Sequence, residues 1–515
     1  MPTTTGRARG WVLPAMAGVA SVALGAGVGE LAAAILAPEA SPFVVVGSLL
    51  IDLAPPWAKD AAIGLFGTAD KVALLTGIAI VLLAVAGAAG VLEVRRPPWG
   101  RVLFGALGLV GVVAAMTRAN APLLAFAPPA LAAVASVITL QFLVTRLPST
   151  DAAPPAKRPE GIDRRRFLGW AGGAAALGVL AAVGGYALQA GTRAVTAIRD
   201  TITLPKPTTN ATVPSGAELD IEGLTPVVTP NEQFYRIDTA LAVPAVDPET
   251  WSLRIHGMVD QEVTLTWDEL LALPLEESVT TLACVSNEVG GNLIGNAVWL
   301  GYPIRELLAR ANPSADADMV LSRSVDGFTA STPLAVLQDD RNAILAVGMN
   351  GEPLPAQHGF PVRMVVPGLY GYVSATKWVV DLEVTRFDAA SAYWTDRGWS
   401  AKGPIKLQSR IDVPRGGQQL TAGTITVAGV AWHQHVGIAA VDVQVDDGPW
   451  QPATLAEAIS IDTWVQWRFD WEAESGTHTL RVRATDADGE VQTSDMQGVV
   501  PDGATGLDER SVTVG

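Results

Sequence analysis

The single cysteine of the chain, Cys284, stands where a reactive side chain is expected. It ends a predicted strand over 279–284 and enters a glycine-rich loop that closes at Gly290 and Gly291. Side chains at strand-to-loop junctions are exposed, and glycines let a bulky ligand approach the backbone. A lone cysteine is most often a small buried hydrophobe. This position instead favours a thiolate that binds a soft metal or acts as a nucleophile.

Three further polar residues lie within 20 positions of one another, beside glycine turns: His358, Arg363 and Lys377. Arg holds a phosphate through a bidentate fork, and Lys holds it as a point charge. Taken singly, the two cations are better explained as surface ion pairs and the histidine as a structural residue. Together they favour an anion-binding loop.

The composition excludes several other kinds of site. One cysteine excludes an intramolecular disulfide, a zinc site built on several cysteines and an all-cysteine iron–sulfur cluster. The first histidine is His256, and the chain has no Cys-x-x-Cys-His motif, so we expect no haem. A net charge of −16 argues against a nucleic-acid partner.

The elements that must position these residues lie after residue 225. Short strands alternate with short helices as far as about residue 390, which predicts an α+β domain. Thr266 and Glu269 form a capping box, and Pro303 opens a helix over 304–311. The predicted strands are 251–256, 279–284, 319–322, 343–347, 361–366 and 377–384.

The pattern changes after about residue 405 to alternating strands with tight turns, which predicts an immunoglobulin-like β-sandwich. The strands are expected at 424–431, 439–445, 465–471, 478–484 and 490–494.

The N-terminal 199 residues hold 16 Lys+Arg and 9 Asp+Glu, a net charge of +7, whereas the rest holds 19 and 42, a net charge of −23. Five apolar segments approach the length of about 20 residues that spans a bilayer. A sixth run, Pro42 to Leu53, is too short and is expected at the membrane interface with Trp57. The spans are predicted at about 11–37, 71–94, 101–119, 122–145 and 167–190.

Charges between the spans set the predicted orientation. Most of the basic residues precede the first span or lie in the second and fourth connections, which puts the N-terminus inside and the residues after about 191 outside. Residues 163–169 resemble a twin-arginine export signal before the fifth span. The alternative is that these three arginines only set the orientation of the span through the positive-inside rule. Glu30 in the first span is either a functional acid or a residue that sits near the outer interface or packs inward.

Four blocks carry a resemblance to a known family. Residues 282–287, 299–308, 349–363 and 366–378 resemble the sulfite oxidase family of molybdenum enzymes, and the likeness extends over about 225–500. It implies molybdopterin as the cofactor, with Cys284 as the one protein ligand to molybdenum. His358, Arg363 and Lys377 would hold the pterin and its phosphate.

The resemblance also implies weaker site residues. Asn231 and Arg236 fall where the family begins its cofactor pocket, and Asn287, Ser374 and Thr376 could donate to the pterin, although Ser and Thr in loops also bond to their own backbone. The expected cofactor-binding set is Asn231, Cys284, Asn287, His358, Arg363, Ser374, Thr376 and Lys377, and the expected catalytic set is Cys284, Arg236 and Trp399.

The chain departs from the family near the metal. Glu288 and Val289 replace arginines after the cysteine, and Trp399 replaces a tyrosine. Arg236 matches the active-site arginine only with a gap; without one, Asp238 takes its place. Because sulfite is a dianion and wants positive charge, these departures leave the substrate open.

The sequence thus predicts an α-helical transmembrane bundle over 1–199, a linker over 200–224, an α+β molybdopterin domain over 225–400 and an immunoglobulin-like, dimerisation-type domain over 405–500. We expect a membrane-anchored, extracytoplasmic oxidoreductase that transfers oxygen atoms to or from a small molecule, exchanges electrons with an external carrier and forms a homodimer. Sulfoxide reduction is one alternative. A non-enzymatic, membrane-anchored binding protein is the alternative from another class.

Overall fold

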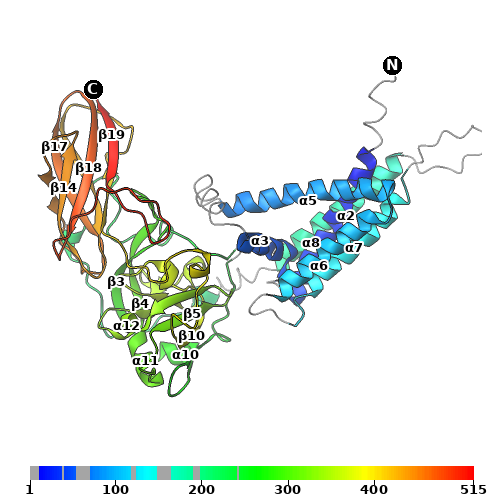
Figure 1. Cartoon of the computed structure of the whole chain (residues 1–515), viewed down its shortest axis with the longest axis horizontal. Coiled ribbons are helices and arrows are strands. Elements are labelled where there is room, and N and C mark those ends of the chain that lie inside the picture. The colour runs from blue at the N-terminus through cyan, green and yellow to red at the C-terminus, as the bar shows by residue number, and fades with distance from the viewer. Residues whose placement is uncertain are drawn as a thin grey trace, which may run out of the picture. The chain divides into compact units, whose positions relative to one another are not determined.

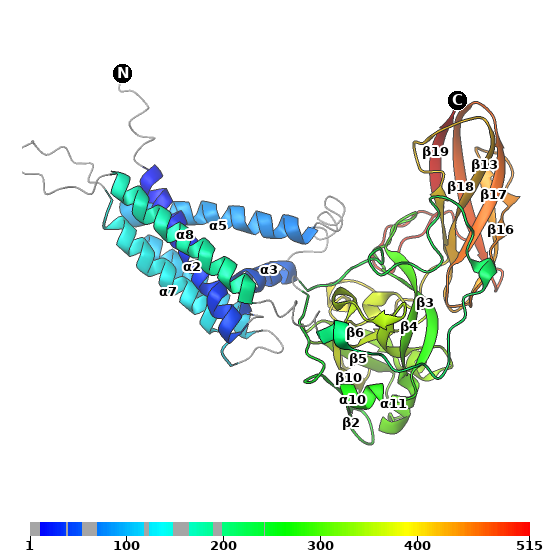
Figure 2. The same cartoon turned by 180° about the vertical axis from the view of Figure 1, so that it is seen from behind.

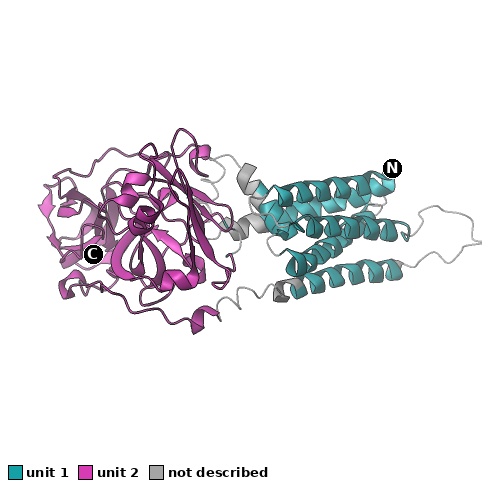
Figure 3. Ribbon diagram, turned by 90° about the horizontal axis from the view of Figure 1, so that it is seen from below, with its two compact units in different colours: residues 1–194, 240–243 teal, residues 195–239, 244–515 magenta. Residues whose placement is uncertain are grey.

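The structure is a computed structural model that describes residues 11–37, 40–53, 70–117, 123–147, 164–188, 198–240 and 243–515. The chain divides into two compact units (Figure 3). The first comprises residues 1–194 with 240–243, and the second comprises residues 195–239 with 244–515.

The first unit is helical. Among the described residues, five helices are long and apolar enough to cross a membrane, and they coincide with the five predicted spans. A sixth helix, α3 (Pro42–Leu53), has 12 residues, too few to span. Trp57, which was expected beside it, lies outside the described residues. The five are α2 (Val12–Leu36), α5 (Asp70–Arg95), α6 (Trp99–Met116), α7 (Ala127–Val144) and α8 (Arg164–Leu188) (Figure 1).

Glycines let α2 lie directly against its neighbours. A Cβ at Gly27 would come within 2.0 Å of the carbonyl oxygen of Gly178 in α8, and one at Gly18 within 1.9 Å of the carbonyl oxygen of Ala86 in α5. Small residues that allow such close approach are the usual basis of helix association in lipid. Glu30 on α2 packs inward, since Ser41 Oγ donates to its two carboxylate oxygens at 2.8 and 2.9 Å just before α3 begins.

The second unit begins with a segment of mostly extended chain, 198–224, which the sequence suggested as a linker. It lies along this unit: Thr208 N donates to Leu275 O at 2.7 Å, and Leu219 N donates to Gln466 Oε1 at 2.6 Å. Part of the expected linker therefore belongs to the surface of the second unit.

Two sheets form the α+β part of this unit. One has the order β2-β1-β10-β5-β6 and the other the order β3-β4-β7-β8, with β9 also paired to β7. The predicted strands are all present within a few residues. Their bounds are β1 (Ser252–Gly257), β2 (Val263–Thr266), β3 (Glu276–Ala283), β4 (Ile294–Pro303), β5 (Met319–Ser324), β6 (Thr329–Pro333), β7 (Ile344–Met349), β8 (Glu352–Pro353), β9 (Arg363–Val365) and β10 (Val379–Thr385).

Three short helices connect these strands: α10 (Trp267–Leu271), α11 (Ile304–Ala311) and α12 (Leu334–Gln338). The capping box predicted at Thr266 and Glu269 is confirmed, because each side chain bonds the backbone N–H of the other. The helix predicted after Pro303 is also confirmed, with the same bounds.

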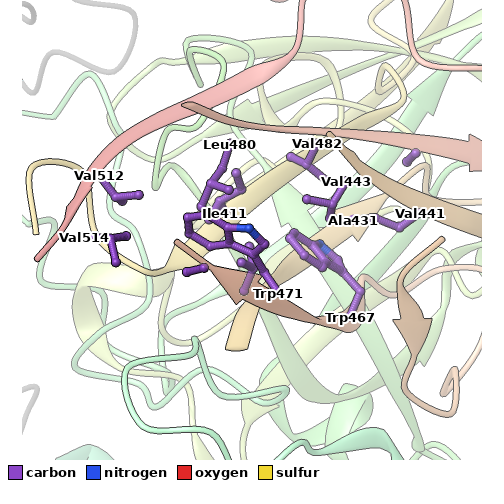
Figure 4. Packing of buried hydrophobic residues seen from close by; sticks show 13 residues of the cluster. Ile411, Ala431, Val441, Val443, Trp467, Trp471, Leu480, Val482, Val512 and Val514 are labelled. Carbon is purple, nitrogen blue, oxygen red and sulfur yellow. The ribbon is translucent and has the colours of Figure 1, made fainter. Parts of the chain in front are cut away.

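The C-terminal part is a two-sheet sandwich, seen from both sides in Figures 1 and 2. Its sheets have the orders β11-β13-β17-β16 and β12-β19-β18-β14-β15. Their bounds are β11 (Gln408–Val413), β12 (Gln419–Leu420), β13 (Gly423–Trp432), β14 (Ile438–Val445), β15 (Gln451–Pro452), β16 (Thr454–Leu455), β17 (Val465–Ala473), β18 (Gly476–Asp486) and β19 (Asp508–Val514). Trp467 and Trp471 fill the core between the sheets (Figure 4).

The strand predicted over 490–494 is wrong. Val491 makes only an isolated bridge to Thr485. The cause is local: Asp486 Oδ1 accepts the N–H groups of Asp488 and Glu490 at 3.0 and 2.8 Å in a tight turn. After this turn the chain returns to β18 for this single bridge, in which Gln492 N donates to Ala484 O at 2.9 Å. The place beside β18 is taken by β19 instead.

Loops of the sandwich hold β3 at Thr281, three residues before the cysteine. Thr281 N donates to Asp462 O at 3.0 Å, and Trp464 N donates to Thr281 Oγ1 at 2.9 Å. Gln434 Nε2 adds a bond to Thr281 O at 3.3 Å. The sandwich therefore fixes the strand that delivers Cys284.

Candidate active site

A cavity open to solvent lies in the second unit, next to the end of β3. Apolar and aromatic side chains with a few polar groups line it, as in small-molecule and cofactor sites. Five segments of the chain build it. They contribute residues 234–239, residues 284–286, the β5–β6 hairpin, residues 358–378, and Trp394 with Trp399.

Cys284 follows directly after β3 and lines this cavity. Its thiol is free and its residue only 8% exposed, and Ser286 N donates to Sγ at 3.4 Å. Burial raises the pKa of the Cys284 thiol. A raised pKa disfavours a free thiolate nucleophile, whereas a bound metal would deprotonate the thiol directly. Both roles that the sequence left open, metal ligand and nucleophile, require this thiol to lose its proton.

The residues after His358 form a tight turn that gathers the three anion-binding candidates. Gly359 has φ +114, and a Cβ there would lie 2.9 Å from Arg363 Cβ and 3.2 Å from Lys377 Cβ. Only glycine adopts this backbone easily and leaves that space. The backbones of Arg363 and Lys377 also pair as an isolated bridge. All three residues line the cavity.

Arg363 is a buried cation, with 5% of the residue exposed. Its guanidinium donates to the carbonyl oxygens of His358 at 3.1 Å, Met364 at 3.4 Å and Ala375 at 3.5 Å. Burial lowers the pKa of Arg363 to about 10. Since carbonyl oxygens carry no full charge, this guanidinium is suited to pair with an anion that enters the cavity.

Lys377 and His358 differ in charge. Lys377 Nζ donates to Asp238 Oδ2 at 2.7 Å and to Gln357 O at 3.2 Å, and burial lowers its pKa to about 8. Burial, with help from nearby Arg363 and Lys377, lowers the pKa of His358 to about 3, so the imidazole is neutral at physiological pH. Its Nε2 lies 3.2 Å from Asn231 O, which makes Nε2 the protonated donor nitrogen.

Four of the other predicted residues do not line the cavity, because their side chains bond within the protein. Asn231 bonds Met349 O, and Asn287 Oδ1 accepts from Leu293 N at 2.8 Å. Ser374 Oγ donates to Tyr370 O at 3.0 Å, and Thr376 Oγ1 lies 2.7 Å from Ser322 Oγ. Asn231 still orients His358 through its carbonyl, and Asn287 closes the loop after Cys284.

Of the two remaining predicted residues, one lies in the cavity wall and the other lies outside it. Trp399 lies in the cavity wall, where it packs against Tyr372 with ring centroids 5.9 Å apart. Arg236 is absent from the described residues that line the cavity; its Nε instead bonds Asp238 Oδ2 at 2.9 Å. Its neighbours Tyr235 and Ile237 line the cavity in its place. Glu288, expected near the metal, is an exposed loop residue outside the wall.

Sequence reasoning missed three hydroxyl groups of the wall. Burial raises the pKa of Tyr235 far above its ordinary value, and the nearby Cys284 thiol adds to the effect. Ser324 Oγ is buried and has no hydrogen-bond partner among the described residues. Tyr372 Oη donates to Ser400 O at 2.7 Å. The Asp326-Gly327 turn and the Tyr-Gly-Tyr run at 370–372 were the available signals for two of them.

Two protein families match the second unit. Residues 240–394 match the oxidoreductase molybdopterin binding domain, and residues 408–482 match the bacterial Ig domain. Across the residues that the structure describes, no group of three or more His, Cys, Asp or Glu side chains could hold a metal ion.

The chain is also similar to individual proteins. The mitochondrial sulfite oxidases of Macaca fascicularis and Homo sapiens are each 32% identical over 300 residues, which cover 50% of this chain and 54% of theirs. The chain thus spans about half the length of these curated relatives. The uncharacterized oxidoreductase YuiH of Bacillus subtilis is 32% identical over 160 residues, 30% of this chain and 76% of that protein. The solved sulfane dehydrogenase SoxCD of Paracoccus pantotrophus is 22% identical, with a TM-score of 0.49 over 57% of this chain and 82% of that one.

Proposed function

Because the chain belongs to the sulfite oxidase family of molybdopterin oxidoreductases, we propose that its cavity holds the molybdenum cofactor and that the enzyme transfers oxygen atoms in two-electron steps. The observation that carries this proposal is the pairing of two unusual groups in one cavity. They are the buried thiol of Cys284 and the buried guanidinium of Arg363, whose hydrogen-bond acceptors are neutral carbonyl oxygens.

The residues present fit the cofactor. A pterin phosphate would give Arg363 the counter-charge that the carbonyls around it lack. Lys377 would add a second cation at the same end. Ser324 Oγ, which is buried without a partner, would gain one from a polar atom of the pterin. A molybdenum ion matches the soft thiolate of Cys284.

The roles of this chain's own residues follow from these contacts. The molybdenum centre, when bound, supplies the two-electron exchange. Cys284 would bind the metal, with Ser286 N donating to its sulfur. Neutral His358 would present its unprotonated Nδ1 as an acceptor, since Nε2 donates to Asn231 O. Tyr235 keeps its proton because burial raises its pKa, so its hydroxyl can donate to an oxygen atom held near Cys284.

The proposal extends to location. Five helices of the first unit are long and apolar enough to span a membrane. The arginines gathered in alternate connections favour an inside N-terminus and an extracytoplasmic second unit. Such an enzyme would exchange electrons with an external carrier and would not bind haem itself. Its sandwich is the surface through which we expect it to form a homodimer.

Metal and pterin analysis tests the cofactor directly. We expect purified protein to hold molybdenum and an extractable pterin in about equal amounts. The variant Arg363→Gln should lose most of both, because it removes the buried cation that meets the phosphate. Arg254→Gln is the matched control, since Arg254 pairs with Glu262 at the surface and not with residues of the cavity. Wild-type protein without molybdenum and pterin would instead favour the non-enzymatic binding protein.

A further inference from the structure

One wall of the cavity is aromatic. Phe328 comes from the β5–β6 hairpin, and Tyr372 follows directly after Gly371. Trp394 and Trp399 flank a turn of 3₁₀ helix. The ring centroids of Trp394 and Trp399 are 6.1 Å apart, and those of Tyr372 and Trp399 are 5.9 Å apart. Tyr372 Oη is engaged by Ser400 O, so the ring contributes to the wall as an apolar surface. This wall offers a continuous face for an apolar or aromatic group.

The charges in the wall do not suit a small dianion. Among the described residues that line the cavity, the groups with a positive charge at physiological pH are Arg363 and Lys377. Under the proposed function both meet the cofactor phosphate, and Lys377 is already bonded to Asp238. A second carboxylate, Asp326, stands on the hairpin beside Phe328. Arg236 lies outside the lining and bonds Asp238, and its charge still acts on His358 and Lys377. Under the proposed function, a dianionic substrate would therefore find the nearby cations engaged by the cofactor phosphate or by Asp238.

The side chain that follows Arg236 along the chain sets the polarity of this part of the wall. Arg236 is turned to Asp238, while Ile237 lines the cavity with 40% of the residue exposed. The backbone thus presents an apolar side chain to the cavity at a place where the neighbouring residue could have presented a cation. Exposed apolar surface in a cavity is stabilised when an apolar ligand covers it.

From this wall, we propose that the substrate is an uncharged molecule that carries an apolar or aromatic group beside the atom that exchanges oxygen. Trp399, Trp394 and Tyr372 bind that group, and Ile237 takes the place of a cation that a dianion would need. This inference rests on the proposed function, and it concerns binding alone.

Calorimetric titration of the full-length, molybdenum-loaded protein in detergent tests the inference with two probes, methyl phenyl sulfoxide and sulfate. We expect the sulfoxide to bind at least tenfold more tightly than sulfate. Trp399→Leu should weaken sulfoxide binding about tenfold, because it removes aromatic surface from the wall. Trp450→Leu is the matched control: Trp450 lies in the sandwich under Arg483, away from the cavity, and its loss should leave both affinities unchanged.

A gain of function completes the test. Ile237→Arg should tighten sulfate binding at least tenfold, while Ile237→Met should leave it within twofold of the wild type. Tighter binding of sulfate than of sulfoxide by the wild type, or an unchanged sulfoxide affinity in Trp399→Leu, would overturn the inference. Molybdenum and pterin are measured on the same samples. Their absence would count against the proposed function, whereas the order of the two affinities decides the present inference without turnover.

Discussion

The environment of Cys284 holds its thiol in the neutral form. Burial keeps its pKa high, so the unliganded thiol stays protonated and weakly nucleophilic. The backbone N–H of Ser286 already points at the sulfur and would stabilise the negative charge that metal binding creates. The same environment that suppresses thiol chemistry is therefore compatible with a metal–thiolate bond.

The variant Cys284→Ser should fold and lose activity. Serine is nearly isosteric and can accept the same N–H bond, but an oxygen ligand is harder and less electron-donating than thiolate. We expect turnover to fall by at least about 100-fold, measured with an artificial electron carrier, with an unchanged circular dichroism spectrum. Full turnover by the serine variant would show that Cys284 is not a metal ligand.

His358 gives a prediction about pH. Its pKa lies near 3 rather than 6.5 because of burial and of the nearby cations Arg363 and Lys377. Below about pH 6.5 the imidazole of His358 is protonated in the unfolded chain but stays neutral in the folded protein. This residue therefore lowers the free energy of unfolding as the pH falls from about 6.5 towards 3. Histidine NMR should show its ring unshifted between pH 7.5 and 4.5, with His358→Gln providing the assignment.

His478 is the internal control for that titration. Its hydrogen bond to Asp446 raises its pKa above the ordinary value. Its signal should therefore titrate in the same range with a raised midpoint, and its contribution to stability is present at low pH and lost as the pH rises. A His358 signal that titrates together with that of His478 would contradict the buried, neutral imidazole.

At the scale of elements, β3 joins the cavity to the sandwich. Thr280 and Thr281 are adjacent on this strand and both are fully buried, but their hydroxyls differ. Thr281 Oγ1 donates to Asn296 Oδ1 at 2.9 Å and accepts from Trp464 N, whereas Thr280 Oγ1 has no partner among the described residues. One hydroxyl thus ties the strand to its surroundings, and the other does not.

Substituting Thr281 and Thr280 in turn tests whether the hydroxyl of Thr281 holds β3 in place. Thr281→Val keeps the shape and leaves the partners in Asn296 and Trp464 unsatisfied, which should lower the free energy of unfolding of the second unit by about 2 kcal/mol. Thr280→Val removes a buried hydroxyl that already lacks a partner and should be neutral or stabilising. Chemical denaturation followed by tryptophan fluorescence measures both. Equal effects of the two substitutions would show that the hydroxyl of Thr281 does not hold β3.

The elements that the sequence predicted well are those with local causes. The capping box at Thr266 and the helix after Pro303 depend on residues three or four positions apart, so their spacing alone predicts them. The strand expected at 490–494 failed because Asp486 bonds backbone groups ahead of it, a local competition that strand alternation does not reveal.

The cavity required more than local pattern. His358, Arg363 and Lys377 could be grouped from the sequence because they stand close together along the chain. Ser324 and Tyr372 stand near recognisable turns, but strand pairing and loop packing decide which of the side chains there face the cavity. For the same reason Asn287, Ser374 and Thr376 looked like ligand donors but bond to the protein itself. The fold also decides that Ile237, and not the adjacent Arg236, lines the wall of the cavity.

For the whole molecule, charge separates the two parts of the chain. The first 199 residues carry a net charge of +7, and the rest carries −23. The positive charge gathers in connections that the positive-inside rule assigns to the cytoplasm. Under the proposed function and location, the second unit would cross the membrane after acquiring its cofactor, and the arginines at the start of α8 would then act as an export signal for folded proteins.

Replacing both Arg164 and Arg165 with Lys separates the two roles of these arginines. Lysine keeps the positive charge that orients a span, but a receptor that reads an arginine pair no longer recognises it. We expect the variant to insert its first four spans normally and to keep the second unit inside. Protease added to spheroplasts should then spare residues beyond 200 in the variant and digest them in the wild type. The matched control is Arg95 and Arg96 replaced with Lys, at the end of α5, where charge alone should matter. If the protease reaches the second unit equally in all three proteins, the arginine pair is only a topological signal and the domain crosses by another route.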